Sequence, residues 1–182
     1  MKTLAALALT CALALSACAK GEQGEPGHKA AREGLAIPLD GIEYTVFITR
    51  ELNTAIPPDS AYYKGPPAPR GQTFYGVFVQ VCNRGKRPHR TTDRFHIEDN
   101  QGNRFDPIAL PADNQFAYHA QTLAPDACIP QAGSVAQLGP TAGSMLLFQI
   151  PLANAENRPL ELVVEGVNPA EPKDFRTFTL DI

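Results

Sequence analysis

The chain has 182 residues, of which 43% are hydrophobic, enough for the core of one domain, and this composition excludes a disordered polyelectrolyte. Sixteen basic against nineteen acidic residues give a net charge of −3, so there is no electrostatic reason to expect a nucleic-acid partner. Seventeen prolines and fourteen glycines disfavour long helices and are typical of short strands joined by turns.

The N-terminus has the pattern of a secretory signal peptide. A short positive start precedes an apolar run from Leu4 to Leu15 that is too short to cross a bilayer, and small residues follow it. Leu15-Ser16-Ala17-Cys18 resembles the lipobox of bacterial lipoproteins. The resemblance implies that residues 1–17 are removed and that Cys18 carries a lipid, which anchors the chain in a membrane. Ordinary secretion, with cleavage at a nearby site, is the alternative.

Two features next to the lipobox extend the prediction. Ala19 is not the aspartate that retains many lipoproteins at the inner membrane. If the source has two membranes, the resemblance therefore implies an outer-membrane anchor facing the periplasm. Residues 18–34 hold mostly Gly, Glu, Lys and Ala, with little to bury, so we expect a disordered tether after the lipidated cysteine.

From residue 35 onward, apolar side chains recur at every second position, which is the pattern of half-buried strands. Ile42, Tyr44, Val46 and Ile48, for example, are expected to share one buried face. Seven or eight short strands with turn-rich connections predict an all-β, antiparallel β-sandwich over residues 35–182. The expected strands cover residues 42–49, 75–82, 95–97, 104–105, 145–150, 160–165 and 177–182.

Several of these strands carry a family resemblance. The strand Phe74–Cys82 ends in Asn83-Arg84-Gly85, the hairpin Asp99–Phe105 has the form D-x-x-G-x-x-F, and the apolar strand Met145–Pro151 ends in proline. These features resemble a telokin-like family of domains of unknown function. The resemblance implies an immunoglobulin-like sandwich that is exported, often lipid-anchored and without enzymatic activity.

The chain has four cysteines, and two remain for the folded part. Cys11 should leave with the signal peptide and Cys18 should carry the lipid, which leaves Cys82 and Cys128. In an oxidising compartment these two thiols most simply form a disulfide. A redox or metal-binding pair is the alternative, but no C-x-x-C or Cys/His spacing supports it.

The densest charge cluster follows the strand that ends at Cys82. It is a candidate anion site for phosphate-bearing headgroups, a polyanionic glycan or an acidic protein. The alternative is a solvated turn whose charges keep the sandwich soluble. The candidate anion patch consists of Arg84, Lys86, Arg87 and Arg90, with His89 and Arg94 nearby.

A proline-rich loop from Ala55 to Pro69 carries two adjacent tyrosines, Tyr62 and Tyr63. In a stiff loop these rings could stack on a sugar or a partner surface, so the loop is a candidate binding site. The alternative is a connecting loop whose tyrosines lie back on the sandwich. A loop of this length in a compact domain is often functional.

No catalytic constellation is readable in the sequence. The histidines lack paired metal spacing, neither Ser134 nor Ser144 lies in G-x-S-x-G, and there is no phosphate-cradling glycine loop. Oxygen-bearing residues between Asp99 and Asp106 lack the spacing of a helix–loop–helix calcium motif, and a hairpin turn explains them. We therefore expect no enzymatic activity, no cofactor and no metal.

Together these observations predict a membrane-anchored lipoprotein of the bacterial cell envelope, whose β-sandwich has a non-catalytic binding or scaffolding role. The expected partners are the membrane, through the lipid on Cys18, and an envelope protein or glycan. One alternative is an accessory subunit or inhibitor that contacts an envelope enzyme through Tyr62 and Tyr63. A further alternative is a hydrolase whose site is assembled only in three dimensions.

Overall fold

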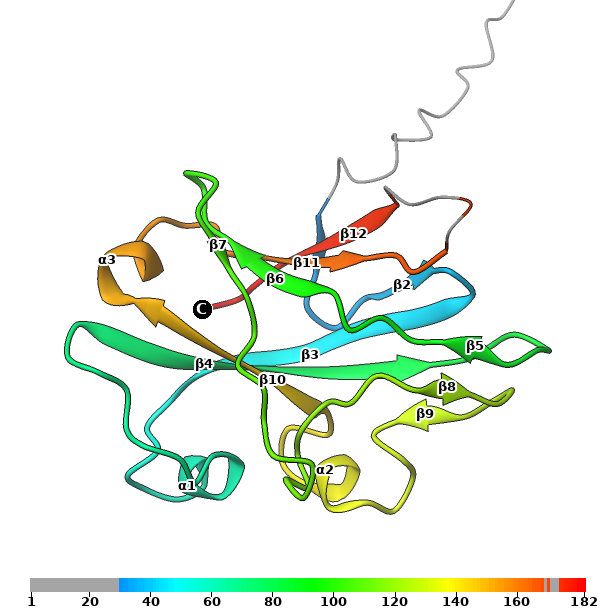
Figure 1. Ribbon diagram of the computed structural model, residues 1–182, viewed down its shortest axis with the longest axis horizontal. Coiled ribbons are helices and arrows are strands. Elements are labelled where there is room, and N and C mark those ends of the chain that lie inside the picture. The colour runs from blue at the N-terminus through cyan, green and yellow to red at the C-terminus, as the bar shows by residue number, and fades with distance from the viewer. Residues whose placement is uncertain (1–29, 169, 171–173) are drawn as a thin grey trace, which may run out of the picture.

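The computed structural model describes residues 30–168, 170 and 174–182, and Figure 1 shows that they form two β-sheets packed face to face. The predicted signal peptide, Cys18 and residues 19–29 of the predicted tether lie outside the described residues. The predicted all-β sandwich is confirmed. All strand pairs are antiparallel except β1 with β12.

Two sheets of five strands and one small ribbon make up the fold. The first sheet has the order β1 (Ala31–Arg32), β12 (Phe175–Thr179), β11 (Glu161–Glu165), β6 (Phe95–Glu98) and β7 (Arg104–Phe105). The second has the order β10 (Ser144–Pro151), β4 (Gln72–Cys82), β3 (Ile42–Leu52) and β2 (Ala36–Leu39), with β9 (Cys128–Ile129) also paired to β4. The ribbon pairs β5 (His89–Arg90) with β8 (Thr122–Leu123).

In the described part of the chain, three single-turn helices connect the strands: α1 (Asp59–Tyr62), α2 (Val135–Leu138) and α3 (Leu152–Ala155). In Figure 1, α1 and α2 lie on the outer side of the sheet that contains β4. Of the helices in the described part of the chain, none has the length and apolar character needed to cross a membrane.

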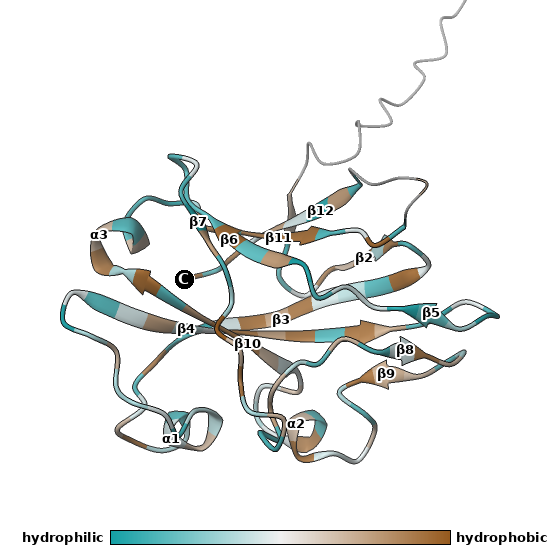
Figure 2. Ribbon diagram, in the orientation of Figure 1, coloured by the Kyte–Doolittle hydropathy of each residue, from teal (hydrophilic) through white to brown (hydrophobic). Residues whose placement is uncertain are grey.

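The main core lies between the two sheets. Each strand contributes alternate side chains to it, as the period of two predicted. Val46, Val77 and Phe148 from the second sheet and Leu162 and Phe178 from the first are fully buried there. Figure 2 shows the contrast between these hydrophobic strands and the hydrophilic segment around β5.

A β-bulge in β3 changes which residues face this core. The pairing of β3 with β4 shifts register between Val46 and Ile48, so the side chains beyond the bulge change sides. Ile48 is therefore 39% exposed, and Thr49 is buried instead. The prediction that Ile48 shares a buried face with Ile42, Tyr44 and Val46 is wrong at this one position.

The folded part begins earlier than the predicted boundary at residue 35. Ala31 and Arg32 pair with Phe178 and Thr179 at the edge of the first sheet. The Glu33 carboxylate accepts a hydrogen bond from the Thr49 hydroxyl at 2.5 Å. These contacts bind the end of the predicted tether to the sandwich.

A second, smaller core lies on the outer face of the sheet that contains β4. Tyr62 is only 1% exposed, and its ring packs edge-on against Phe78 and Phe116, with centroids 4.9 Å away in both cases. An ion pair of 2.9 Å between Arg50 and Asp59 holds α1 against β3. The proline-rich loop is therefore folded onto the sheet. The buried members of this core are Leu52, Tyr62, Phe74, Phe78, Met145 and Leu147.

Asp99 joins the turn between β6 and β7 to the segment around α3. Its carboxylate accepts hydrogen bonds from the backbone N–H groups of Gln101 and Asn103 and from the side-chain amides of Asn103, Asn154 and Asn157. Burial raises the pKa of Asp99, but the bonds from the asparagines outweigh this and hold the pKa well below its ordinary value of 3.8. The carboxylate oxygens are thus occupied by N–H donors.

The burial of Tyr62 gives a first prediction. Replacing Tyr62 by alanine should destabilise the fold by about 3 kcal/mol, because it removes a large side chain from the second core. The hydroxyl is buried and has no hydrogen-bond partner in the described part of the chain, so Tyr62→Phe should be neutral or stabilising by about 1 kcal/mol. Urea unfolding of both variants measures this. Equal losses in both would mean that the hydroxyl is bonded.

Asp99 gives a second prediction, which concerns pH. Because its pKa is lower in the folded than in the unfolded chain, its contribution to stability is present above pH 3.8 and is lost as the pH falls below that value. The difference in melting temperature between the wild type and Asp99→Asn should therefore shrink from about pH 6 to about pH 2. Asp93→Asn, at an exposed aspartate, is the control. A difference that is constant with pH would contradict the assignment.

Candidate functional site

The segment of residues 84–90, which comprises the loop after β4 and the strand β5, is held by one buried side chain at its base. We call it the basic loop. Asn83 is 0% exposed, and its Nδ2 donates to the carbonyl oxygens of Arg87 at 2.7 Å and Leu123 at 2.9 Å. Its Oδ1 accepts from the backbone N–H of Gly85 at 2.9 Å. The loop backbone is therefore fixed to the neighbouring strand β8.

A disulfide closes the same end of the strand. Cys82 of β4 and Cys128 of β9 lie directly opposite each other, and their Cα atoms are 4.1 Å apart. The disulfide expected from the sequence is thus present. The disulfide joins two strands that are already paired, and it adds a covalent link at the base of the basic loop.

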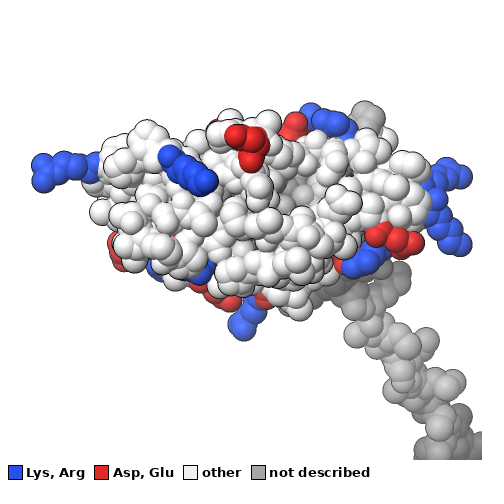
Figure 3. Space-filling model, turned by 90° about the horizontal axis from the view of Figure 1, so that it is seen from below, with Lys and Arg blue, Asp and Glu red and all other residues white. Residues whose placement is uncertain are grey.

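The four residues of the candidate anion patch are all exposed, but they are not equivalent. Arg84 Nε lies 3.5 Å from a carboxylate oxygen of Glu43. Lys86, Arg87 and Arg90 make no ion pair with any other described residue. In Figure 3, lysine and arginine side chains project from the end of the molecule at which β5 lies.

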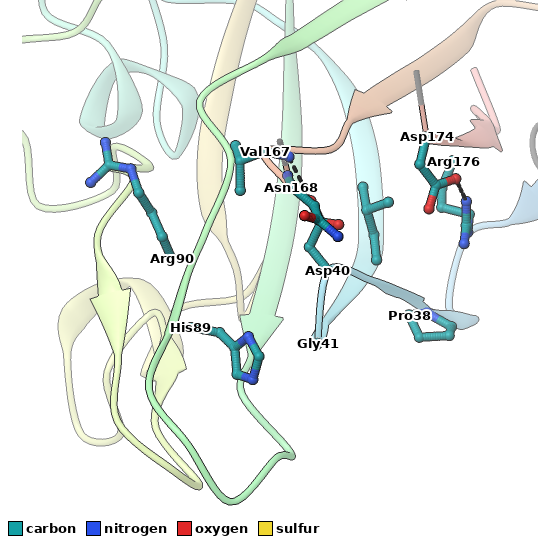
Figure 4. A pocket seen from close by; sticks show the side chains of 10 residues that line it. Pro38, Asp40, Gly41, His89, Arg90, Val167, Asn168, Asp174 and Arg176 are labelled. Carbon is teal, nitrogen blue, oxygen red and sulfur yellow. Dashed lines mark hydrogen bonds and ion pairs between the residues drawn. The ribbon is translucent and has the colours of Figure 1, made fainter. Parts of the chain in front are cut away.

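A groove of about 600 Å³ adjoins the basic loop. Figure 4 shows its walls, which come from three segments that are distant in the sequence. His89 and Arg90 of β5 form one wall and the turn Asp40-Gly41 between β2 and β3 forms another. The third wall includes Asn168 and Arg176.

Both carboxylates of this groove are already occupied by donors. Asp40 Oδ2 accepts from the backbone N–H groups of Val167 at 2.5 Å and Asn168 at 2.9 Å. Asp174 forms an ion pair with Arg176. Among the described side chains that line the groove, those of His89, Arg90 and Asn168 carry nitrogen donors that bond to no other described residue.

Gly41 allows this arrangement. Its φ of +78° is in the left-handed region, and a Cβ atom there would lie 2.6 Å from Cε1 of His89. Only glycine lets the imidazole pack against the turn. In this groove His89 and Asn168 can donate to an anionic group, while the side chain of Arg90, at the boundary with the basic loop, points away from them (Figure 4).

The candidate binding loop requires a correction. Tyr62 is not available for binding, since its ring is part of the second core. Tyr63 is half-buried, and its ring packs against Phe74 with centroids 5.1 Å apart. It nevertheless lines a separate pocket of about 590 Å³, which we call the α1 pocket, together with Phe116.

A cluster of titratable groups on the outer face of the first sheet was not foreseen. His96 is buried, and its Nδ1 lies 3.3 Å from Glu165, which also pairs with Arg104 at 3.2 Å. Burial lowers the pKa of His96, and Arg104 lowers it further, while Glu165 and Glu98 oppose the shift. No group of three His, Cys, Asp or Glu side chains in the described ranges is placed to hold a metal ion.

The sequence pointed to the basic loop and to Tyr63, but it did not predict the other residues that line the groove and the α1 pocket. Asp40, Asn168 and Phe116 lie in segments that have no binding motif of their own. The Asp40-Gly41 pair signals a turn, but nothing in the sequence places that turn beside His89.

No known family profile matches the sequence, and no curated protein is significantly similar to it. The fold is similar to that of ycdA from Bacillus subtilis, a protein provisionally classed as a lipoprotein, with a TM-score of 0.53 and 15% identity. That match covers 80% of this chain but only 38% of ycdA.

Two further solved structures are similar. An uncharacterized β-sandwich protein from Clostridium difficile has a TM-score of 0.51 and 14% identity, over 88% of this chain and 99% of that one. The yjhA protein of Bacillus subtilis has a TM-score of 0.49 and 11% identity, over 83% and 99% of the two chains. At these identities the similarity shows the β-sandwich fold alone, and membership of the telokin-like family stays a prediction.

Proposed function

We propose that this chain is a lipid-anchored, non-catalytic binding protein of the bacterial cell envelope, which binds anionic partners through the basic loop and the adjoining groove. The lipobox Leu15-Ser16-Ala17-Cys18 supports the anchor. The similarity in fold to a protein provisionally classed as a lipoprotein is consistent with it.

One observation carries the binding role. Lys86, Arg87 and Arg90 are exposed, make no ion pair within the described part of the chain, and lie on a loop fixed by Asn83 and the adjacent disulfide. A loop that is ordered before binding loses little conformational entropy when a partner binds. A loop whose charges served only to keep the surface soluble would not need a fixed backbone.

The chemistry of the groove supports a role without catalysis. His89 lies against Gly41, and the carboxylates of Asp40 and Asp174 are occupied by other donors. A catalytic imidazole is usually oriented by a carboxylate, and His89 forms no ion pair with any described carboxylate. The alternative contact with an envelope enzyme through Tyr62 and Tyr63 is weakened, because Tyr62 is buried.

The anchor gives a third prediction. Cys18→Ser should abolish lipid attachment and leave the chain unprocessed or released, because only a thiol can form the thioether. Labelling cells with a fatty-acid probe and following the chain in membrane fractions measures this. Cys11→Ser should keep the label, and equal labelling of the Cys18 variant would remove the anchor from the proposal.

The basic loop gives a fourth prediction. The lipidated chain in a nonionic detergent should bind immobilised dextran sulfate, and charge reversal at Arg87 and Arg90 should weaken this about tenfold at low salt. The difference should fade as salt screens the charges. The matched control reverses Arg70 and Arg158, two exposed cations outside the basic loop, the groove and the α1 pocket. If both double variants lose binding equally, net charge explains the result and the loop has no special role.

A further inference from the structure

The α1 pocket lies apart from the basic loop. One wall is the loop that follows α1, residues 63–65, and the other is the segment from Ile108 to Phe116. Its volume of about 590 Å³ is in the range of sites that hold a small molecule. In Figure 3, the side of the molecule on which α1 and α2 lie carries few charged residues.

The two walls are tied together, so the pocket is formed before any ligand binds. Asn114 Nδ2 donates to the Tyr62 carbonyl oxygen at 2.9 Å, and Asn114 Oδ1 accepts from the Phe116 N–H at 2.9 Å. The rings of Tyr62 and Phe116 pack beneath this link, with centroids 4.9 Å apart. A preformed pocket binds its ligand at a lower entropic cost.

The ring of Tyr63 is also fixed. It packs edge-on against Phe74, and its hydroxyl end lies so close to Gly65 that a Cβ atom there would be 2.2 Å from the tyrosine hydroxyl. Any residue other than glycine at position 65 would displace the ring. Tyr63 thus presents a rigid aromatic surface in the wall of the pocket.

The remaining lining defines the chemistry of the ligand. Asp113 and Gln115 are exposed and bring a carboxylate and an amide, which together accept and donate hydrogen bonds. Lys64 and Asp113 contribute one charge of each sign, so the pocket favours neither an anion nor a cation. Aromatic rings and planar polar groups in one pocket suit a ligand with apolar C–H faces and hydroxyls at its edge.

We propose that the α1 pocket binds a neutral saccharide. A sugar ring lies against the aromatic side chains of Tyr63 and Phe116, and its hydroxyls bond to Asp113 and Gln115. Salt does not weaken this binding, because no net charge drives it. The site is independent of the anionic partner proposed for the basic loop.

The test is calorimetric titration of the lipidated chain, in a zwitterionic detergent without sugar, with cellotetraose, maltotetraose and fully N-acetylated chitotetraose. At least one of the three should bind with a millimolar or lower dissociation constant. Tyr63→Leu keeps the apolar volume against Phe74 but removes the flat ring, and should weaken binding about tenfold. Tyr63→Phe should bind within about threefold of the wild type.

Phe47→Leu is the matched control, since it makes the same type of change at an exposed aromatic residue of β3 and should not alter binding. A double variant, Asp113→Ala with Gln115→Ala, changes only exposed residues and tests the hydrogen bonds if Tyr63→Leu lowers the melting temperature. The proposal is overturned if none of the sugars binds. It is also overturned if charge reversal at Arg87 and Arg90 abolishes the binding, or if a proline-rich peptide binds in place of all three sugars.

Discussion

The structure depends on β4, a strand that is buried on both faces. Tyr75, Val77 and Val79 point into the main core, while Phe74 and Phe78 point the opposite way into the second core. β4 is also paired along both edges, with β3 on one side and with β10 and β9 on the other. The second core holds α1 and the segment near Phe116, so both walls of the α1 pocket are held by the outer face of β4. The end of the same strand, at Cys82 and Asn83, sets the position of the basic loop.

Three buried polar side chains hold the connections that strands alone cannot order. Asn83 fixes the basic loop, Asp59 ties α1 to Arg50 and to the backbone N–H of Asn53, and Asp99 links the β6–β7 turn to the segment around α3. In each case one side chain satisfies several partners at once. Loss of such a residue removes several hydrogen bonds at once, so the cost is larger than that of one bond.

The two proposed sites differ in chemistry and lie on different elements. The basic loop and groove present nitrogen donors at one end of the sandwich, where the carboxylates of Asp40 and Asp174 are already occupied. The α1 pocket presents aromatic rings and balanced charges on the outer face of a sheet. Separation of this kind would let one sandwich hold two unlike groups at once.

The sequence by itself determined the class of fold and the local elements, because alternation with a period of two depends only on which residues are apolar. It also identified the pair Cys82 and Cys128 by elimination and the cations of the basic loop by their density. The tertiary structure decided which face of a sheet each side chain lies on and which remote segments lie close together. Tyr62 is buried because its loop folds over the outer face of β4, and Ile48 is exposed because a bulge reverses the alternation. Ala31 pairs with Phe178, and Asp40 lies in one groove with His89. The packed sheets bring these remote segments together, and no local sequence pattern encodes such a contact.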